Sequence, residues 1–113
     1  MEFFIKIFKA LSDPNRVRIL KMLELRPLCV CELPGLLKIA TSTVSKHLSI
    51  LRDSGMITDR KAGKWVIYRL NTDSSNLQVR QLLSLLPTWL NNDDIIKENL
   101  IKISKMENSN CNI

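Results

Sequence analysis

The periodicity of the sequence changes at Gly55, and this change constrains the fold more than any other feature. Upstream, apolar residues recur at helical spacing and predict a helix over about 42–54, which ends at a glycine free to adopt the left-handed conformation. The buried stripe of this helix consists of Val44, Leu48 and Leu51. Downstream, two strand-like runs, Met56–Lys61 and Lys64–Leu70, are joined across Ala62-Gly63 and predict a hairpin. We therefore expect a mainly α-helical chain with one β-hairpin.

Further helical segments flank this unit on both sides. Ser12-Asp13-Pro14 combines a side-chain cap with a proline at the first helical position, and predicts a helix over about 14–25. A short amphipathic helix precedes it, and a short helix follows it up to about Lys38. Pro87 should kink or end the apolar helix after the hairpin, and a last helix is expected near Asp94–Lys105. This order of elements is that of a winged helix-turn-helix.

Positive charge is concentrated on the predicted helix and hairpin. The formal net charge is +6, and residues 38–69 carry seven basic against two acidic side chains, a net charge of +5. Release of condensed counterions drives such a stretch onto a polyanion, although a solvated basic face has the same composition. In a winged helix the helix enters the major groove and the hairpin tip lies near the DNA backbone or minor groove.

The coincidence of charge and fold favours double-stranded DNA over the alternative, a protein-binding winged helix. Small hydroxyl side chains at the start of the helix suit close approach to base edges, and Thr41-Ser42 is also expected to cap that helix. The candidate DNA contacts are Thr41, Ser42, Thr43, Ser45, Lys46, Arg52, Lys61 and Lys64. Lys61 and Lys64 are expected on backbone phosphates.

Membrane, secreted and enzymatic functions are not expected. No uncharged run approaches the length of a membrane span, and Met1–Lys6 does not resemble a secretion leader, which predicts a soluble cytoplasmic domain. The three cysteines include Cys29 and Cys31, whose spacing suits a disulfide poorly. Cytosolic thiols of this kind bind metal or sense redox state more often than they crosslink. A thiol enzyme is the less favoured alternative, because the sequence suggests no catalytic base or polar pocket beside them.

Pro34 indicates how Cys29 and Cys31 are arranged. Residues two apart in an α-helix point about 200° from each other, whereas on extended backbone they share a face. Pro34 fits the first turn of a helix that begins at Cys31, which leaves Cys29 extended just outside that helix. Both sulfurs then lie near a helix N-terminus, which favours the thiolate that thiophilic ions prefer. The segment is predicted to be a partly preformed site, with two buried small apolar residues as the alternative.

Four segments resemble the ArsR/SmtB family of metal-sensing repressors. They are Leu11–Leu20 (LSDPNRVRIL), Thr43–Gly55 (TVSKHLSILRDSG), Asp59–Leu70 (DRKAGKWVIYRL) and Leu28–Leu33 (LCVCEL). The last resembles the arsenic-repressor branch, and the resemblance covers about residues 3–90. It implies a homodimer through the first and C-terminal helices that represses its own resistance operon and leaves operator DNA when its inducer binds. It also implies that His47 is a DNA-contacting position.

With this resemblance, the chain is expected to have three parts. A winged-helix domain for DNA binding and dimerisation covers 1–90, a C-terminal helical extension covers 91–106, and a disordered tail covers 107–113. The sequence departs from the arsenic-repressor pattern at Pro34, where the family has a third cysteine. The paired histidines and carboxylates of the family's C-terminal zinc site are also missing from the sequence.

The resemblance makes As(III) or Sb(III) the expected inducer, held by Cys29 and Cys31. Such ions take three soft ligands, and the third is expected from Cys111 of either subunit, from a small thiol or from water. Cd(II) and Pb(II) also favour thiolates and are the alternative inducers. A thiol-redox switch is the alternative signal.

Overall fold

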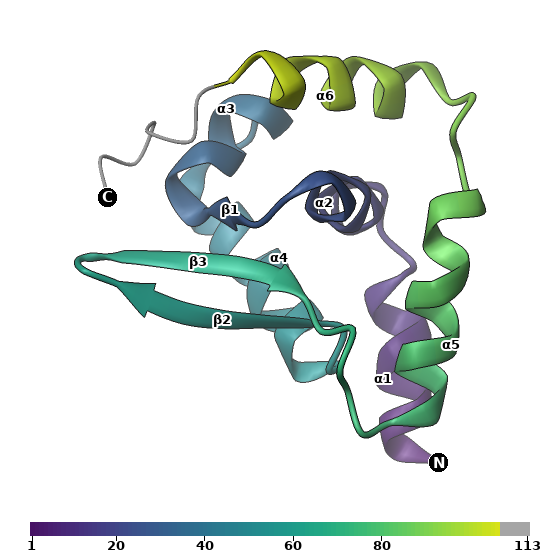
Figure 1. Ribbon diagram of the computed structural model, residues 1–113. Helices are drawn as coiled ribbons and strands as arrows, with labels where there is room; N and C mark the ends of the chain where they lie inside the picture. Colours follow the sequence, from purple (N-terminus) through teal and green to yellow (C-terminus); the bar gives the residue numbers. More distant parts are fainter. Residues whose placement is uncertain (107–113) are drawn as a thin grey trace.

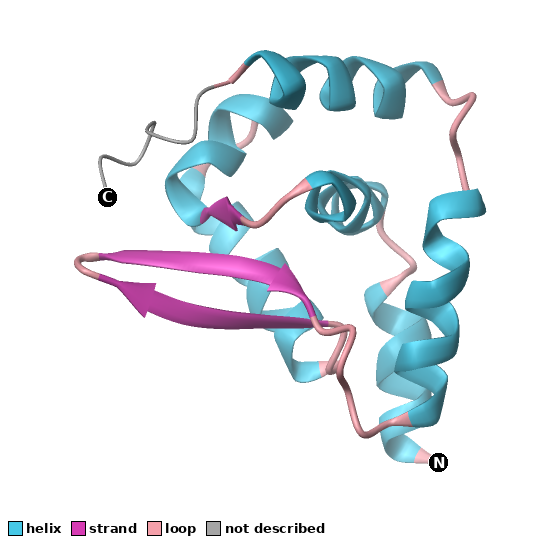
Figure 2. Cartoon of the chain, viewed as in Figure 1, coloured by secondary structure: helices cyan, strands magenta, loops and turns pink. Residues whose placement is uncertain are grey.

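The structure is a computed structural model that describes residues 1–106. It is mainly helical, with one three-stranded antiparallel sheet (Figures 1 and 2). In chain order the elements are α1 Glu2–Ala10, α2 Pro14–Leu25, β1 Leu28–Cys29, the 3₁₀ helix η1 Val30–Glu32, α3 Leu33–Leu37, α4 Thr41–Asp53, β2 Ile57–Ala62, β3 Trp65–Leu70, α5 Leu77–Leu85, the 3₁₀ helix η2 Leu86–Thr88 and α6 Asp94–Lys105. The expected winged helix-turn-helix is confirmed.

Local signals set most of the boundaries. The Asp13 carboxylate accepts hydrogen bonds from the backbone amides of Asn15 and Arg16, which confirms the predicted cap of α2. Gly55 follows α4 with a φ of +81°, in the left-handed region, as expected. A Cβ at Gly55 would also lie 3.1 Å from Phe3 Cζ, so a larger residue there would meet both strain and a clash. Pro87 lies in η2, directly after the end of α5.

Two features differ from the sequence-based expectation. The predicted cap Thr41-Ser42 is wrong, because α4 already begins at Thr41 and its N-cap is Ala40, without a side-chain hydrogen bond. The sheet also has a third strand that local periodicity did not indicate. In β1, Leu28 pairs with Tyr68 and Cys29 pairs with Ile67, so β3 lies between β1 and β2. The first cysteine therefore belongs to the same sheet as the hairpin.

The core surrounds α2, which Figure 1 shows near the middle of the fold. Ile19, Leu20 and Met22 of α2 are fully buried, and Leu48 and Leu51 of α4 pack into the same cluster. This burial fixes α4 by its apolar stripe, so the opposite face of the helix stays open. Among the described residues, no helix is both long and apolar enough to span a membrane.

Candidate metal centre and nucleic-acid interface

Cys29 and Cys31 lie together at the junction of β1 and η1. Cys29 has extended backbone (φ −78°, ψ 146°), as predicted, and caps η1, which begins at Val30, one residue earlier than expected. The Cys31 thiol is directed at Cys29 Sγ, with 3.0 Å between the two sulfurs. Pro34 falls in the first turn of α3, where its missing N–H leaves no helical hydrogen bond unmade. The two sulfurs are thus close enough to share one thiophilic ion.

Glu32 holds this turn in place. Its Oε1 accepts a 2.8 Å hydrogen bond from the Cys29 backbone amide, while Cys29 Sγ accepts from the Cys31 amide at 3.5 Å. Its Oε2 accepts from Arg26 Nη2 at 3.2 Å. Glu32 is only 7% exposed, so its carboxylate is committed to these partners. Sequence reasoning missed Glu32, although a carboxylate three residues after a capping residue is a known capping signal.

The two cysteines differ in access. Cys29 is 1% exposed, whereas Cys31 is exposed to solvent. Within residues 1–106, no group of three His, Cys, Asp or Glu side chains is placed to hold a metal ion. Cys111, the third predicted ligand, lies outside the described residues, as does the tail at 107–113.

The open face of α4 carries most of the predicted DNA contacts. Its exposed residues include Thr41, Ser42, Thr43, Ser45, Lys46 and Arg52. Arg52 Nη1 lies 3.1 Å from Asp59 Oδ2 on β2 and forms an ion pair that joins the helix to the hairpin. Lys61 and Lys64 are exposed at the hairpin tip, and Lys64 Nζ lies 5.3 Å from the centre of the Trp65 ring. Two separate basic surfaces, one helical and one at the hairpin tip, are therefore presented to solvent.

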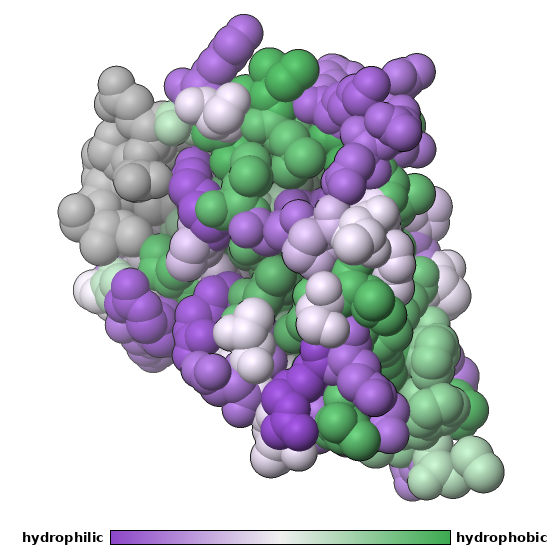
Figure 3. Space-filling model, turned by 45° about the vertical axis from the view of Figure 1, so that its right-hand side comes forward, coloured by the Kyte–Doolittle hydropathy of each residue, from purple (hydrophilic) through white to green (hydrophobic). Residues whose placement is uncertain are grey.

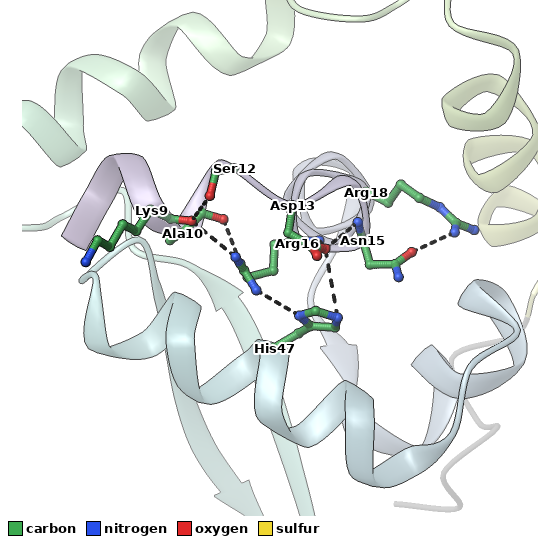
Figure 4. A network of polar contacts seen from close by, with 8 residues as sticks. All are labelled: Lys9, Ala10, Ser12, Asp13, Asn15, Arg16, Arg18 and His47. Atoms are coloured by element: carbon green, nitrogen blue, oxygen red, sulfur yellow. Dashed lines mark hydrogen bonds and ion pairs between the residues drawn. The ribbon is translucent and has the colours of Figure 1, made fainter. Parts of the chain in front are cut away.

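His47 does not share this open face. Its side chain is turned toward α2 and is only 9% exposed, with Nδ1 3.1 Å from Arg16 Nη1 and Nε2 3.9 Å from Asp13 Oδ1 (Figure 4). The implied role of His47 in contacting DNA does not fit this position. The helical spacing explains the difference, because His47 follows Val44 by three residues and belongs to the buried stripe.

Arg16 joins three helices at this point. Its Nε donates to the Ala10 carbonyl at 2.9 Å and its Nη2 to the Lys9 carbonyl at 3.1 Å, at the C-terminal end of α1. Its Nη1 meets His47 of α4 (Figure 4). One guanidinium on α2 thus satisfies the last carbonyls of α1 and orients the DNA-facing helix. The sequence offered no signal for this role, because all three partners come from other elements.

Tyr68 lies on β3, between β1 and β2. Partial burial raises the pKa of the Tyr68 phenol above its ordinary value, and the nearby Asp59 carboxylate raises it further, while Arg52 opposes both. The phenol therefore remains neutral at physiological pH, and the basic side chains alone set the charge of the hairpin.

Comparison with known proteins supports the reading of these surfaces. Residues 13–59 match the sequence model of the family described as "Bacterial regulatory protein, arsR family". The arsenical resistance operon repressor of Escherichia coli (strain K12) is 48% identical over 68 residues, which cover 59% of this chain and 58% of that protein. The cadmium resistance regulatory protein CadC homolog of Staphylococcus aureus is 42% identical over 79 residues, 69% of this chain and 62% of that protein. Both alignments thus span less than two thirds of the relative.

A longer alignment and a solved structure extend the comparison. The arsenic resistance transcriptional regulator ArsR2 of Pseudomonas putida (strain KT2440) is 37% identical over 102 residues, covering 89% of this chain and 86% of that protein. The structure of HlyU from Vibrio cholerae matches with a TM-score of 0.63 and 32% identity, over 77% of this chain and 90% of that chain. The match to ArsR2 extends over nearly the whole of both proteins, and the winged fold is shared. The chain belongs to the arsR family of bacterial regulatory proteins.

Proposed function

We propose that this chain is a cytoplasmic transcriptional repressor that binds operator DNA as a homodimer and leaves it when As(III) or Sb(III) binds Cys29 and Cys31. The observation that carries the proposal is the 3.0 Å separation of the two sulfurs on a segment that is part of the wing sheet. The ligand site and the DNA-facing elements are therefore joined by direct contacts.

Two routes lead from the cysteines to the DNA interface. Cys29 pairs with Ile67 of β3, whose strand continues into the exposed hairpin. Cys31 lies in η1, directly before α3, and α3 packs against α4. An ion held by both sulfurs fixes β1 relative to η1, and any change in this angle moves the hairpin and the DNA-facing helix together. Dimers of this class bind two half-sites about one helical turn apart, so a small shift disrupts the fit.

Substitution of Ser45 or Lys46 by alanine is expected to weaken specific DNA binding. Both side chains lie on the open face of α4, and loss of a base-edge contact costs about 1–3 kcal/mol and relaxes sequence preference at that position. Fluorescence anisotropy on the promoter fragment and on a scrambled fragment measures the effect. Lys97→Ala, on the exposed face of α6, serves as the matched control. Equal losses on both fragments would contradict base contact.

Alanine at Lys61 or Lys64 is expected to act differently. The hairpin tip is assigned to phosphates, so each change should weaken binding to all sequences alike and reduce the salt slope by about one unit. A salt titration of the dissociation constant on both fragments measures it. A change of sequence preference in either variant would show that the tip reads bases.

The homodimer is proposed from an apolar surface that α1 and α5 leave open. Its exposed side chains are Phe3, Phe4, Phe8, Leu77 and Leu85. Phe4 and Phe8 pack against each other with 4.9 Å between ring centres, beside a hollow shared with α5. Figure 3 shows apolar side chains gathered along this edge, at the lower right. A contiguous apolar surface of this kind on a small domain marks an interface with a partner.

Phe8→Glu is therefore expected to yield a monomer. The substitution buries a charge in each half of the interface, and the dimer dissociation constant should rise by at least about a hundredfold. Sedimentation velocity measures the oligomeric state. Leu25→Glu changes a similarly exposed leucine at the end of α2 and should leave the dimer intact. A dimeric Phe8→Glu protein would place the interface elsewhere.

The proposed function is tested by following the protein on its own promoter fragment at fixed salt with arsenite, antimonite, cadmium, lead and zinc in parallel. Release by arsenite or antimonite supports the arsenic assignment. Release by cadmium or lead alone identifies the divalent inducer that is the alternative. Release by mild oxidation, with loss of two hydrogens by mass spectrometry and no response to any ion, identifies the redox alternative. Failure to bind the promoter would refute the repressor assignment itself.

A further inference from the structure

We infer that the groove beside Cys31 receives a small anionic thiol, which supplies the third sulfur to the trivalent ion. This inference rests on the proposed function and names the chemistry of one further ligand. The groove runs between η1, α3 and the last turn of α6, and has a volume of about 470 Å³. This volume lies within the range of about 300–1,000 Å³ typical of small-molecule sites. Exposed Cys31 forms part of its wall.

Polar contacts fix the far wall of the groove. Arg18 Nε donates to Asn99 Oδ1 at 2.9 Å, which joins α2 to α6. Arg18 Nη2 and Asn99 Nδ2 both donate to the Leu36 carbonyl, at 3.3 Å and 3.5 Å, which joins the same pair to α3. Asn99 is buried, as are Ile96 and Ile103 on either side of it along α6. The last turn of α6 is therefore held beside the cysteines.

The side chains that reach the groove are positive or uncharged, with one exception. Lys102 and Lys105 line it from α6, together with the thioether of Met106. Lys102 Nζ lies 3.1 Å from Glu98 Oε1, and its hydrogen bond and charge lower the pKa of Glu98, so the pair is ionised at neutral pH. The exception is Glu32, whose carboxylate is already taken by Arg26 and the Cys29 amide. The accessible charge therefore favours an anion.

The groove also has room beside the sulfur. A Cβ built on Gly35 meets no atom within 4 Å, so the wall between η1 and α6 is open at this point. A thiol that enters here reaches Cys31 with its sulfur, while its anionic group meets the two lysines. Met106 adds a soft, polarizable contact.

The ligand exchange balances without any change of oxidation state. Arsenous acid carries three hydroxyl groups, and Cys29, Cys31 and the small thiol each provide one S–H. Three As–O bonds break and three As–S bonds form, and the three protons leave with the three hydroxides as three water molecules. Arsenic remains trivalent with three soft ligands, the preference of a thiophilic ion.

The charge of the thiol is the variable that tests this inference. Arsenite is titrated into the full-length dimer with 2-mercaptoethanesulfonate, 2-mercaptoethanol or cysteamine, which are anionic, neutral and cationic thiols of similar size. The half-saturating arsenite concentration is expected to be about tenfold lower with the anionic than with the cationic thiol. Native mass spectrometry should show one added thiol per bound arsenic.

The lysines provide the matched comparison. In Lys102→Gln plus Lys105→Gln the ratio between the anionic and cationic thiols should fall to within about twofold, whereas Lys97→Gln on the same helix should keep the wild-type ratio. Because each variant is compared with the same three thiols, intrinsic differences between the thiols cancel. The Cys111→Ser protein should give the wild-type ratio as well.

Two results would overturn the inference, and both differ from failure of the proposed function. Equal half-saturation with all three thiols, or a wild-type complex that forms without an added thiol, would exclude the external ligand. In either case arsenite binding would still be lost in Cys29→Ser plus Cys31→Ser. Undiminished arsenite binding by that double variant would instead refute the proposed function.

Discussion

The Cys29→Ser plus Cys31→Ser protein is expected to bind its operator with wild-type affinity and to remain bound in saturating arsenite. In the wild-type protein, saturating arsenite should lower DNA affinity by about 5–150-fold, the usual range of allosteric coupling, whereas the double variant should change by less than about twofold. Without thiolates, the β1–η1 junction offers no soft ligands to a thiophilic ion. Fluorescence anisotropy with and without arsenite measures both quantities.

The double variant is a fair test because serine preserves the local structure. Cys29 Sγ accepts a hydrogen bond from the Cys31 amide at the start of η1, and a serine Oγ accepts the same bond at a position that favours serine. The Glu32 carboxylate keeps its bond to the backbone amide of residue 29. Release of the double variant at the wild-type arsenite concentration would show that the ion acts elsewhere. Cys111→Ser, tested alone, separates the tail cysteine from this pair.

Lys21→Ala is expected to produce the largest loss of stability. Lys21 is 0% exposed, and its Nζ donates to the Leu86 carbonyl at 3.0 Å and to Asn91 Oδ1 at 3.2 Å, and lies 2.7 Å from Glu24 Oε2. Alanine leaves a cavity and removes the partner of these oxygens. The free energy of unfolding should fall by about 3–5 kcal/mol, the cost of breaking a buried charge pair. Urea denaturation followed by circular dichroism measures it.

Two further variants separate the causes of this loss. Lys97→Ala removes a lysine from the exposed face of α6 and should change the unfolding free energy by no more than about 0.5 kcal/mol. Lys21→Met keeps most of the aliphatic stem but donates no hydrogen bond, so its stability should lie between those of wild type and Lys21→Ala. A loss below about 1 kcal/mol in Lys21→Ala would show that the buried ammonium contributes little net stability.

Local chemistry made much of the fold predictable. Asp13-Pro14 marks the start of α2, Gly55 the turn after α4, and Pro87 the end of α5, because each residue restricts its own backbone or caps its neighbours. The extended conformation of Cys29 followed from Pro34 by the same kind of argument. These predictions needed no knowledge of tertiary contacts.

Contacts between distant segments were not predictable from one sequence. The pairing of Cys29 with Ile67 joins residues far apart in the chain, and a two-residue strand leaves no periodicity to detect. Lys21 lies within an apolar run, but its partners on η2 and in the following loop are set by how those segments return to α2. The contact of His47 with Arg16 has the same origin. Residue type alone placed His47 on DNA, and packing placed it inside.

The length of β1 determines how sensitive such a switch can be. A strand of two residues is attached to β3 by a short ladder, and short ladders open locally at much lower cost than global unfolding. A longer β1 would stiffen the junction, so that repression would be tight but more inducer would be needed to lift it. A missing β1 would leave the hairpin unsupported and the operator partly vacant before any inducer arrived. The two-residue strand is thus a compromise between leakiness and sensitivity, made in the backbone and not in the ligands.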